Sequence, residues 1–142
     1  MFNSLPPIAR LAQRILADIE NAVRRFPRYH RYSVGADLRA QAMGVTRCVH
    51  RAWRDPDQKL DRVRELAAAI DDLKITMQLG QQVNAFGSFK EFEAIARLIN
   101  DLGRQSGGWL KQLTVKSQNA GASAPSQRAS ILSSRVAPAA NV

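Results

Sequence analysis

Hydrophobic positions recur every three or four residues through most of the chain, which is the spacing of amphipathic helices. Prolines divide this pattern, because proline suits the first turn of a helix and disfavours helical geometry in the residue before it. Ser33 is the expected N-cap of the second helix, and Ser88 with Glu91 fits a capping box at the start of the fourth. The four predicted helices run from Pro6-Pro7 to Phe26-Pro27, over residues 33–54, over about residues 56–86, and from residue 88 to about residue 113.

No stretch alternates apolar and polar residues for long, so the sequence favours no strands. Four amphipathic helices joined by short turns predict an all-α, up-down-up-down four-helix bundle over residues 1–113. After residue 113 the chain becomes rich in Ser, Ala, Asn, Gln, Gly and Pro, with no acid. We therefore expect residues 114–142 to form a disordered, basic tail.

The third predicted helix carries more apolar surface than one bundle seam requires. Its second stripe includes Ala68 and lies about 150° around the axis from the first. The excess predicts contact with another copy of the protein. The alternatives are deeper burial of its C-terminal half or a bend at Gly80. The predicted oligomer or partner interface comprises Ile75, Leu79, Val83, Phe86, Leu98 and Trp109.

Three glycines stand close together in the fourth predicted helix, at Gly103, Gly107 and Gly108. Each costs roughly 1 kcal/mol relative to alanine in a helix. Because glycine allows close approach, we expect tight helix contact near Gly103 and Gly107. A phosphate-binding loop would need a preceding strand, and the sequence predicts none.

Charge is unevenly distributed. The formal net charge is +9 and the pI is near 10.8, values that predict attraction to polyanions. Residues 1–54 contain ten arginines and only three acids, whereas residues 55–113 are nearly balanced. The polar side of a helix is usually just solvated, but the concentration of cations favours a nucleic-acid surface. The predicted phosphate-binding residues are Arg10, Arg14, Arg24, Arg25, Arg28, Arg31, Arg39, Arg47, Arg51 and Arg54.

Two tyrosines, Tyr29 and Tyr32, alternate with Arg28 and Arg31 in the first connection. Such rings can stack on bases while the cations meet phosphates. Tyrosines more often pack over the end of a bundle and present their hydroxyls to water, and we prefer that interpretation here.

The sequence offers little for catalysis or metal binding. One cysteine and two histidines cannot build a usual structural zinc site, and Cys48 lies beside an apolar stripe, as a small core residue would. Asp71 and Asp72 point about 100° apart on a helix, so they do not form a catalytic pair. We expect no enzyme activity, no cofactor, no metal and no small-molecule substrate. The chain lacks a long apolar run or a leader pattern, so we expect a cytoplasmic protein without membrane contact.

The order of several short motifs resembles the accessory variability determinant proteins of diversity-generating retroelements. It is also similar to the related four-helix proteins encoded in bacterial ribosomal RNA intervening sequences. The resemblance spans about residues 8–113 and contains no catalytic motif. It rests on Phe26-Pro27, Arg31-Tyr32-Ser33-Val34-Gly35, Leu66, Leu73-Lys74, Phe92, Asp101-Leu102-Gly103-Arg104 and Gly107-Gly108-Trp109-Leu110-Lys111.

This resemblance implies a homopentamer of four-helix protomers with a positively charged surface. It also implies partners: the retroelement's reverse transcriptase and its template-repeat RNA, in mutagenic copying of a template into a variable gene. From the basic surface itself we expect contact with phosphates of the RNA or of the RNA–DNA hybrid. Two alternatives stay open, a helical protein-interaction adaptor without nucleic acid and a ribosome-associated four-helix protein.

Overall fold

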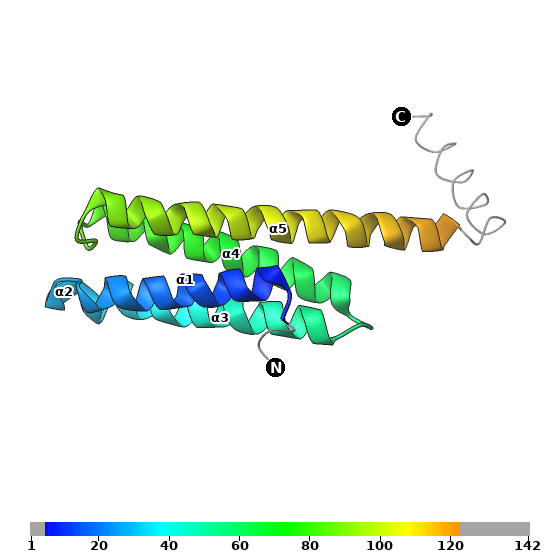
Figure 1. Ribbon diagram of the computed structural model, residues 1–142, viewed down its shortest axis with the longest axis horizontal. Helices are drawn as coiled ribbons and strands as arrows, with labels where there is room; N and C mark the ends of the chain where they lie inside the picture. The colour runs from blue at the N-terminus through cyan, green and yellow to red at the C-terminus, as the bar shows by residue number, and fades with distance from the viewer. Residues whose placement is uncertain (1–4, 123–142) are drawn as a thin grey trace, which may run out of the picture. The chain divides into compact units, whose positions relative to one another are not determined.

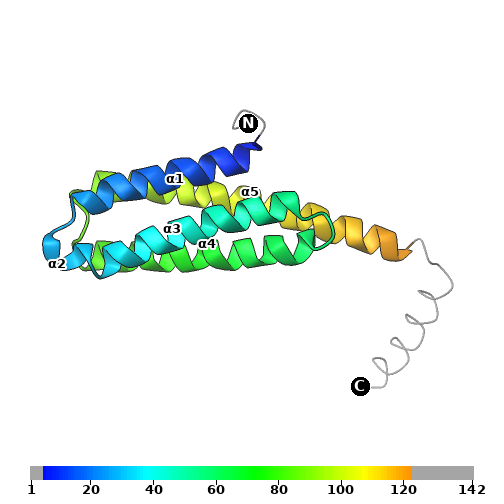
Figure 2. The same cartoon turned by 90° about the horizontal axis from the view of Figure 1, so that it is seen from below.

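The computed structural model describes residues 5–122, and every regular element in that range is an α-helix (Figure 1). The described residues divide into two units, residues 5–110 and residues 111–122. The first unit is the predicted all-α four-helix bundle, in which the four long helices alternate in direction (Figures 1 and 2). The helices are α1 (Pro7–Arg24), α2 (Arg28–Arg31), α3 (Val34–Arg54), α4 (Lys59–Gln82) and α5 (Phe89–Ala122).

Most predicted boundaries agree with the structure to within a few residues, and the differences are local. The short helix α2 lies in the predicted connection between the first and second helices. Residues 114–122 continue α5 as helix, so the prediction of disorder is wrong there. The remainder of the predicted tail, residues 123–142, lies outside the described residues. No helix in the described range is both long enough and apolar enough to cross a membrane.

Helix α4 ends earlier than predicted because Asn84 takes a left-handed backbone conformation, with φ of 58°. The N–H of Ala85 donates to the carbonyl of Gly80 (2.9 Å), and the N–H of Asn84 donates to that of Gln81 (3.1 Å). This pair of bonds is a Schellman motif, which satisfies carbonyls that the end of a helix leaves without partners. Phe86 therefore follows the helix rather than belonging to it.

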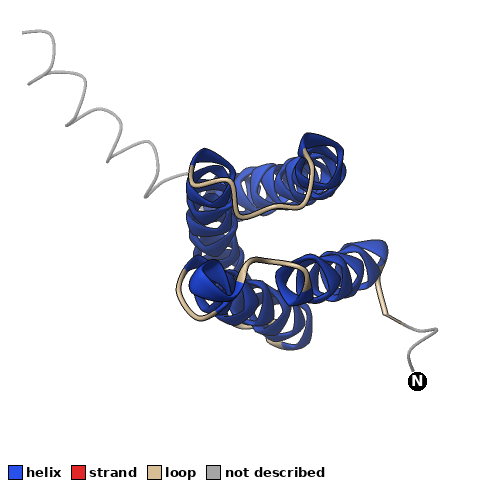
Figure 3. Cartoon of the chain, turned by 90° about the vertical axis from the view of Figure 1, so that its left-hand side faces the viewer, coloured by secondary structure: helices blue, strands red, loops and turns tan. Residues whose placement is uncertain are grey.

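The core is formed by the inward stripes of all four long helices, which surround a common interior when viewed from the end that carries α2 (Figure 3). Side chains of this core are aliphatic along most of the bundle. Its largest fully buried members include Ile15, Leu38, Leu66, Ile70 and Leu102. Burying side chains of this size contributes about 1.5–3 kcal/mol each, which makes the seam the main stabilising feature of the bundle.

Aromatic rings close the core at the end near α2. Phe26 and Phe86 meet edge to face with 5.0 Å between centroids, and Phe86 meets Phe92 at 5.4 Å. A Cβ at Gly80 would lie 3.0 Å from the Phe86 ring, so the glycine makes room for it. Phe86 is only 8% exposed, and its prediction as an interface residue is wrong because this cluster requires it inside.

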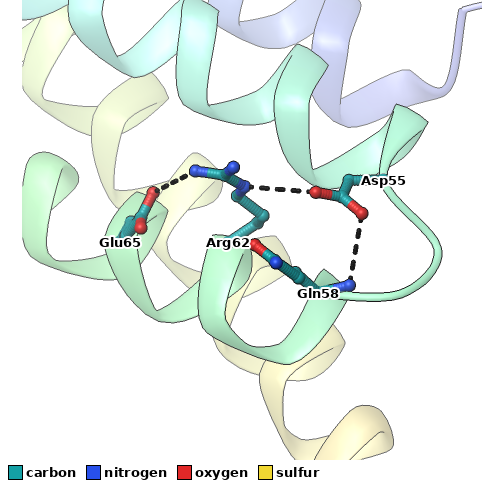
Figure 4. A network of polar contacts seen from close by, with 4 residues as sticks. All are labelled: Asp55, Gln58, Arg62 and Glu65. Carbon is teal, nitrogen blue, oxygen red and sulfur yellow. Dashed lines mark hydrogen bonds and ion pairs between the residues drawn. The ribbon is translucent and has the colours of Figure 1, made fainter.

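The turn from α3 to α4 is held by a polar network shown in Figure 4. Arg62 donates from Nε to Asp55 Oδ2 (3.5 Å) and from Nη1 to Glu65 Oε2 (3.3 Å), while Asp55 Oδ1 accepts the N–H of Gln58 (3.2 Å). Glu65 first and Asp55 second raise the pKa of Arg62, which stays a cation. The charge of Arg62 is therefore balanced by two neighbouring carboxylates, and the side chain stabilises the turn.

The two predicted helix caps are only partly as expected. The Ser88 hydroxyl accepts the N–H of Glu91 (3.1 Å), but the Glu91 carboxylate does not complete the capping box and pairs with Arg25 of α1 instead. Ser33 occupies the N-cap position of α3 without capping it through its side chain. Its hydroxyl instead donates to the carbonyls of Tyr29 and His30, at 3.3 Å each, and so fastens α2 to α3.

The glycines of α5 have different surroundings. At Gly103 a Cβ would lie 3.0 Å from Lys74 Nζ and 3.8 Å from Ile70 Cγ2, which confirms the predicted close contact with α4. At Gly107 and Gly108 a Cβ would meet nothing within 4 Å. The predicted contact at Gly107 is therefore wrong, since that side of the helix is open.

Candidate nucleic-acid interface

Helix α3 has one face in the core and one in water. Leu38, Val45, Val49 and Ala52 are at most 1% exposed. At 100° per residue, the arginines of the same helix must then lie on the outer side. Burial of the apolar stripe therefore places the arginine side chains of α3 on its solvent-exposed side.

We define the α3 cation cluster as Arg47, His50, Arg51 and Arg54. These residues, with Thr46, line an open surface hollow of about 310 Å³. The three arginines are exposed, and none has an acidic partner within the described range. Positions three and four apart on a helix are neighbours, so like charges here repel one another slightly. An anion placed over the hollow would relieve that repulsion.

The ten predicted phosphate-binding arginines divide into two groups of five. Arg10 and Arg28 resemble the α3 cation cluster in being exposed and without an acidic partner among the described residues. The other five are engaged within the bundle. They are Arg14 with Asp18 (3.9 Å), Arg24 with Glu20 (3.8 Å), Arg39 with Glu20 (2.8 Å), Arg25 with Glu91, and Arg31 with backbone carbonyls.

Arg31 differs most from its prediction. Its Nη2 donates to the carbonyl of Arg24 (3.2 Å) and to that of Phe26 (3.4 Å), at the C-terminal end of α1. A cation there also interacts favourably with the helix dipole. Arg31 therefore binds carbonyl groups at the C-terminal end of α1 and is not a free phosphate ligand.

The preferred prediction, that the tyrosines of the first connection pack over the end of the bundle, is wrong. Tyr29 is 84% exposed and Tyr32 71% exposed. They border a second open hollow of about 570 Å³. We call it the α2 hollow, and its lining comprises Tyr29, His30, Tyr32, Ser33, Val34, Asp37, Thr76, Leu79 and Val83.

The predicted interface residues also separate by exposure. Ile75, Leu79 and Val83 are 57%, 50% and 46% exposed and form an apolar stripe on α4. Leu98 and Trp109 are half-buried and pack against the core of their own chain. Lys59 Nζ lies 6.0 Å from the centroid of the Trp109 ring. The exposed part of the predicted interface is therefore on α4.

Cys48 is half-buried beside the core, consistent with a packing role. Burial raises the pKa of its thiol and Glu65 adds to the rise, whereas the nearby cations Arg51 and Arg47 act in the opposite direction. Because the thiolate is the reactive form, the raised pKa makes this cysteine a poor nucleophile at neutral pH.

The chain matches no protein-family model, and comparison with curated proteins and with solved structures likewise produces no match.

Proposed function

We propose that this protein is a non-catalytic, RNA-binding accessory protein that assembles into a homo-oligomer, a pentamer by resemblance. In this proposal it binds a retroelement reverse transcriptase and its template RNA, and supports mutagenic reverse transcription. Its contribution is electrostatic: arginines on α3 and at the α2 end hold phosphates of the RNA or of the RNA–DNA hybrid, and assembly multiplies that surface.

The observation that carries the proposal is the α3 cation cluster. Three guanidinium groups share one helix face, with no acidic partner in the described range, while five other arginines of the first half are already engaged. Guanidinium groups match the geometry of phosphate oxygens and can bind them in pairs. A cluster without acids retains its full attraction for an incoming polyanion.

The direct test is RNA binding by a variant in which Arg47, Arg51 and Arg54 are changed to Gln. Affinity should fall, and the slope of log K against log salt concentration should decrease by about 2, since each phosphate contact with a single strand contributes about 0.7. The fold should survive, because the substitutions lie on the exposed face and remove like-charge neighbours.

The matched control changes Arg64, Arg97 and Arg104 to Gln. It removes the same charge from exposed arginines that pair with Asp61 (3.7 Å), Glu93 (3.2 Å) and Asp101. This control should bind almost as the unaltered protein does. Equal losses in the two variants would mean that net charge alone attracts RNA, and unchanged binding by the α3 variant would refute the proposed surface.

The retroelement role has its own test. A reverse transcriptase gene and paired template and variable repeats should neighbour this reading frame, and the encoded polymerase should co-purify with this protein. Co-purification that resists nuclease and high salt, without any RNA affinity, would instead favour the helical adaptor.

A further inference from the structure

We propose that the α2 hollow binds an unpaired base of single-stranded RNA, with Tyr29 and Tyr32 as its stacking surfaces. This inference rests on the proposed RNA-binding function and adds a second site, at the opposite end of α3 from the cation cluster. Its ligand class is single-stranded RNA, as distinct from duplex.

Exposure of the two rings is the first reason. Tyr29 is 84% exposed and meets the His30 ring edge to face, with 5.2 Å between ring centroids, and Tyr32 is 71% exposed. Neither ring stabilises the aromatic cluster formed by Phe26, Phe86 and Phe92. Exposed rings of this kind can stack on any base, because every base has a π face.

The size of the α2 hollow and the fixed backbone of the segment that carries its tyrosines are the second reason. The α2 hollow, at about 570 Å³, is within the size range of small-ligand sites. The backbone of the α2 segment is held in place at both ends. Arg31 anchors it to the end of α1, and Ser33 bonds to the carbonyls of Tyr29 and His30.

Gly35 adds to this anchoring. A Cβ there would lie 2.9 Å from Val23 Cγ1 and 3.1 Å from the carbonyl oxygen of His30, so α2 and α3 approach as closely as their backbones allow. A platform fixed in this way loses little conformational freedom on binding.

Charge supports a nucleic-acid ligand at this end. Arg28 is exposed, has no acidic partner in the described chain, and lies four residues before Tyr32, on the same side of this turn. The lining contains one acid, Asp37. A carboxylate accepts hydrogen bonds from the exocyclic amino groups of cytosine and adenine, which uracil lacks. We therefore expect cytosine to be preferred to uracil.

The outer face of α3 connects the two sites. Ser33 and Arg51 are eighteen residues apart, which returns to the same side of the helix after about 27 Å. Between them this face carries Ala36, Ala40 and Gly44 together with Asp37, which lines the α2 hollow, and a Cβ at Gly44 would meet nothing within 4 Å. A single strand can thus follow this face from the tyrosines to the α3 cation cluster, and this continuity favours RNA over a second copy as the occupant.

The test compares the unaltered protein with a Tyr29→Ala, Tyr32→Ala variant on oligocytidine of about ten nucleotides and on duplex RNA of equal length. The variant should lose about tenfold in affinity for the single strand, at an unchanged salt slope, because stacking involves no phosphate. Duplex affinity should not change. The Tyr29→Phe, Tyr32→Phe variant keeps both rings and should bind as the unaltered protein does.

Two further comparisons sharpen the test. Asp37→Ala should abolish the preference for oligocytidine over oligouridine, and Arg28→Gln should reduce the salt slope. Three results for the Tyr29→Ala, Tyr32→Ala variant would each overturn the inference. They are an unchanged affinity for the single strand, equal losses of affinity for duplex and single strand, and a smaller assembly mass by light scattering. The last result would assign the rings to contact between copies.

Failure of the proposed function gives a different result. In that case the unaltered protein binds no RNA, or binds it without dependence on the α3 cation cluster. If only the stacking site is wrong, that dependence persists while the tyrosine variant binds normally.

Discussion

At the scale of single residues, Ser106 is a buried polar group whose hydroxyl makes no hydrogen bond. It is 1% exposed, and the hydroxyl has no hydrogen-bond partner among the described residues. An unsatisfied buried hydroxyl costs free energy, and alanine is also the better helix former. Ser106→Ala should therefore raise the free energy of unfolding by about 1 kcal/mol, measured by urea denaturation followed by circular dichroism.

The control for this prediction is Ser88→Ala, which removes a hydroxyl that does make a bond, to the N–H of Glu91. It should lower the free energy of unfolding by about 1 kcal/mol. A loss of stability in both variants would show that Ser106 has a partner after all.

Residue roles were the hardest feature to predict from sequence. Periodicity correctly placed Arg47 and Arg51 on the outside of α3, but nothing in the local sequence distinguishes Arg28, which has no acidic partner in the described range, from Arg31, which caps α1. That distinction depends on where the chain turns back. The exposure of Tyr29 could not be predicted for the same reason, because it depends on the path of α2.

At the scale of elements, the end of α4 depends on one residue. Asn84 has φ of 58°, a conformation that costs most side chains roughly 1–2 kcal/mol and glycine nothing. Asn84→Ala should lower the free energy of unfolding by about 1 kcal/mol, while Asn84→Gly should change it little. Thermal and urea unfolding of the three proteins would measure this.

Gln82→Ala provides the control, since Gln82 is exposed at the last position of α4 and has ordinary helical geometry. Its effect should be close to zero. Equal effects of alanine at positions 82 and 84 would show that the left-handed turn is not what ends the helix.

Element existence was predictable and element ends were less so. The apolar period identified all four long helices because each must bury one stripe, and prolines identified the end of α1 and the turn after α3. The end of α4 was missed because its apolar pattern continues to Phe86, which is buried in the core from the loop and not from the helix. Helix in residues 114–122 was missed because their composition is typical of a tail.

At the scale of the whole molecule, the exposed apolar stripe of α4 is the surface that favours assembly. Ile75 is 57% exposed and does not line the α2 hollow, whereas Leu79 and Val83 of the same stripe do. We predict that light scattering will give the unaltered protein a mass of several chains, and that Ile75→Glu will reduce it to one chain, because burying an unpaired carboxylate opposes association.

Ala94→Glu adds the same kind of charge at an exposed position of α5 and should leave the mass unchanged. A single-chain mass for the unaltered protein would show that the stripe stays exposed to solvent and does not mediate contact between copies, as is common for surface apolar residues. The number of copies is set by geometry between chains, which neither periodicity nor composition specifies.

The shielded state of Cys48 makes the protein suitable for optical experiments. Since its thiol is half-buried and its pKa is raised, a maleimide dye at neutral pH should react far faster with a new cysteine placed at Ala40, on the exposed side of the same helix. A single fluorophore would then stand on the proposed path of the strand, midway between tyrosines and arginines. Its emission would report, in real time, whether a passing nucleic acid covers that helix.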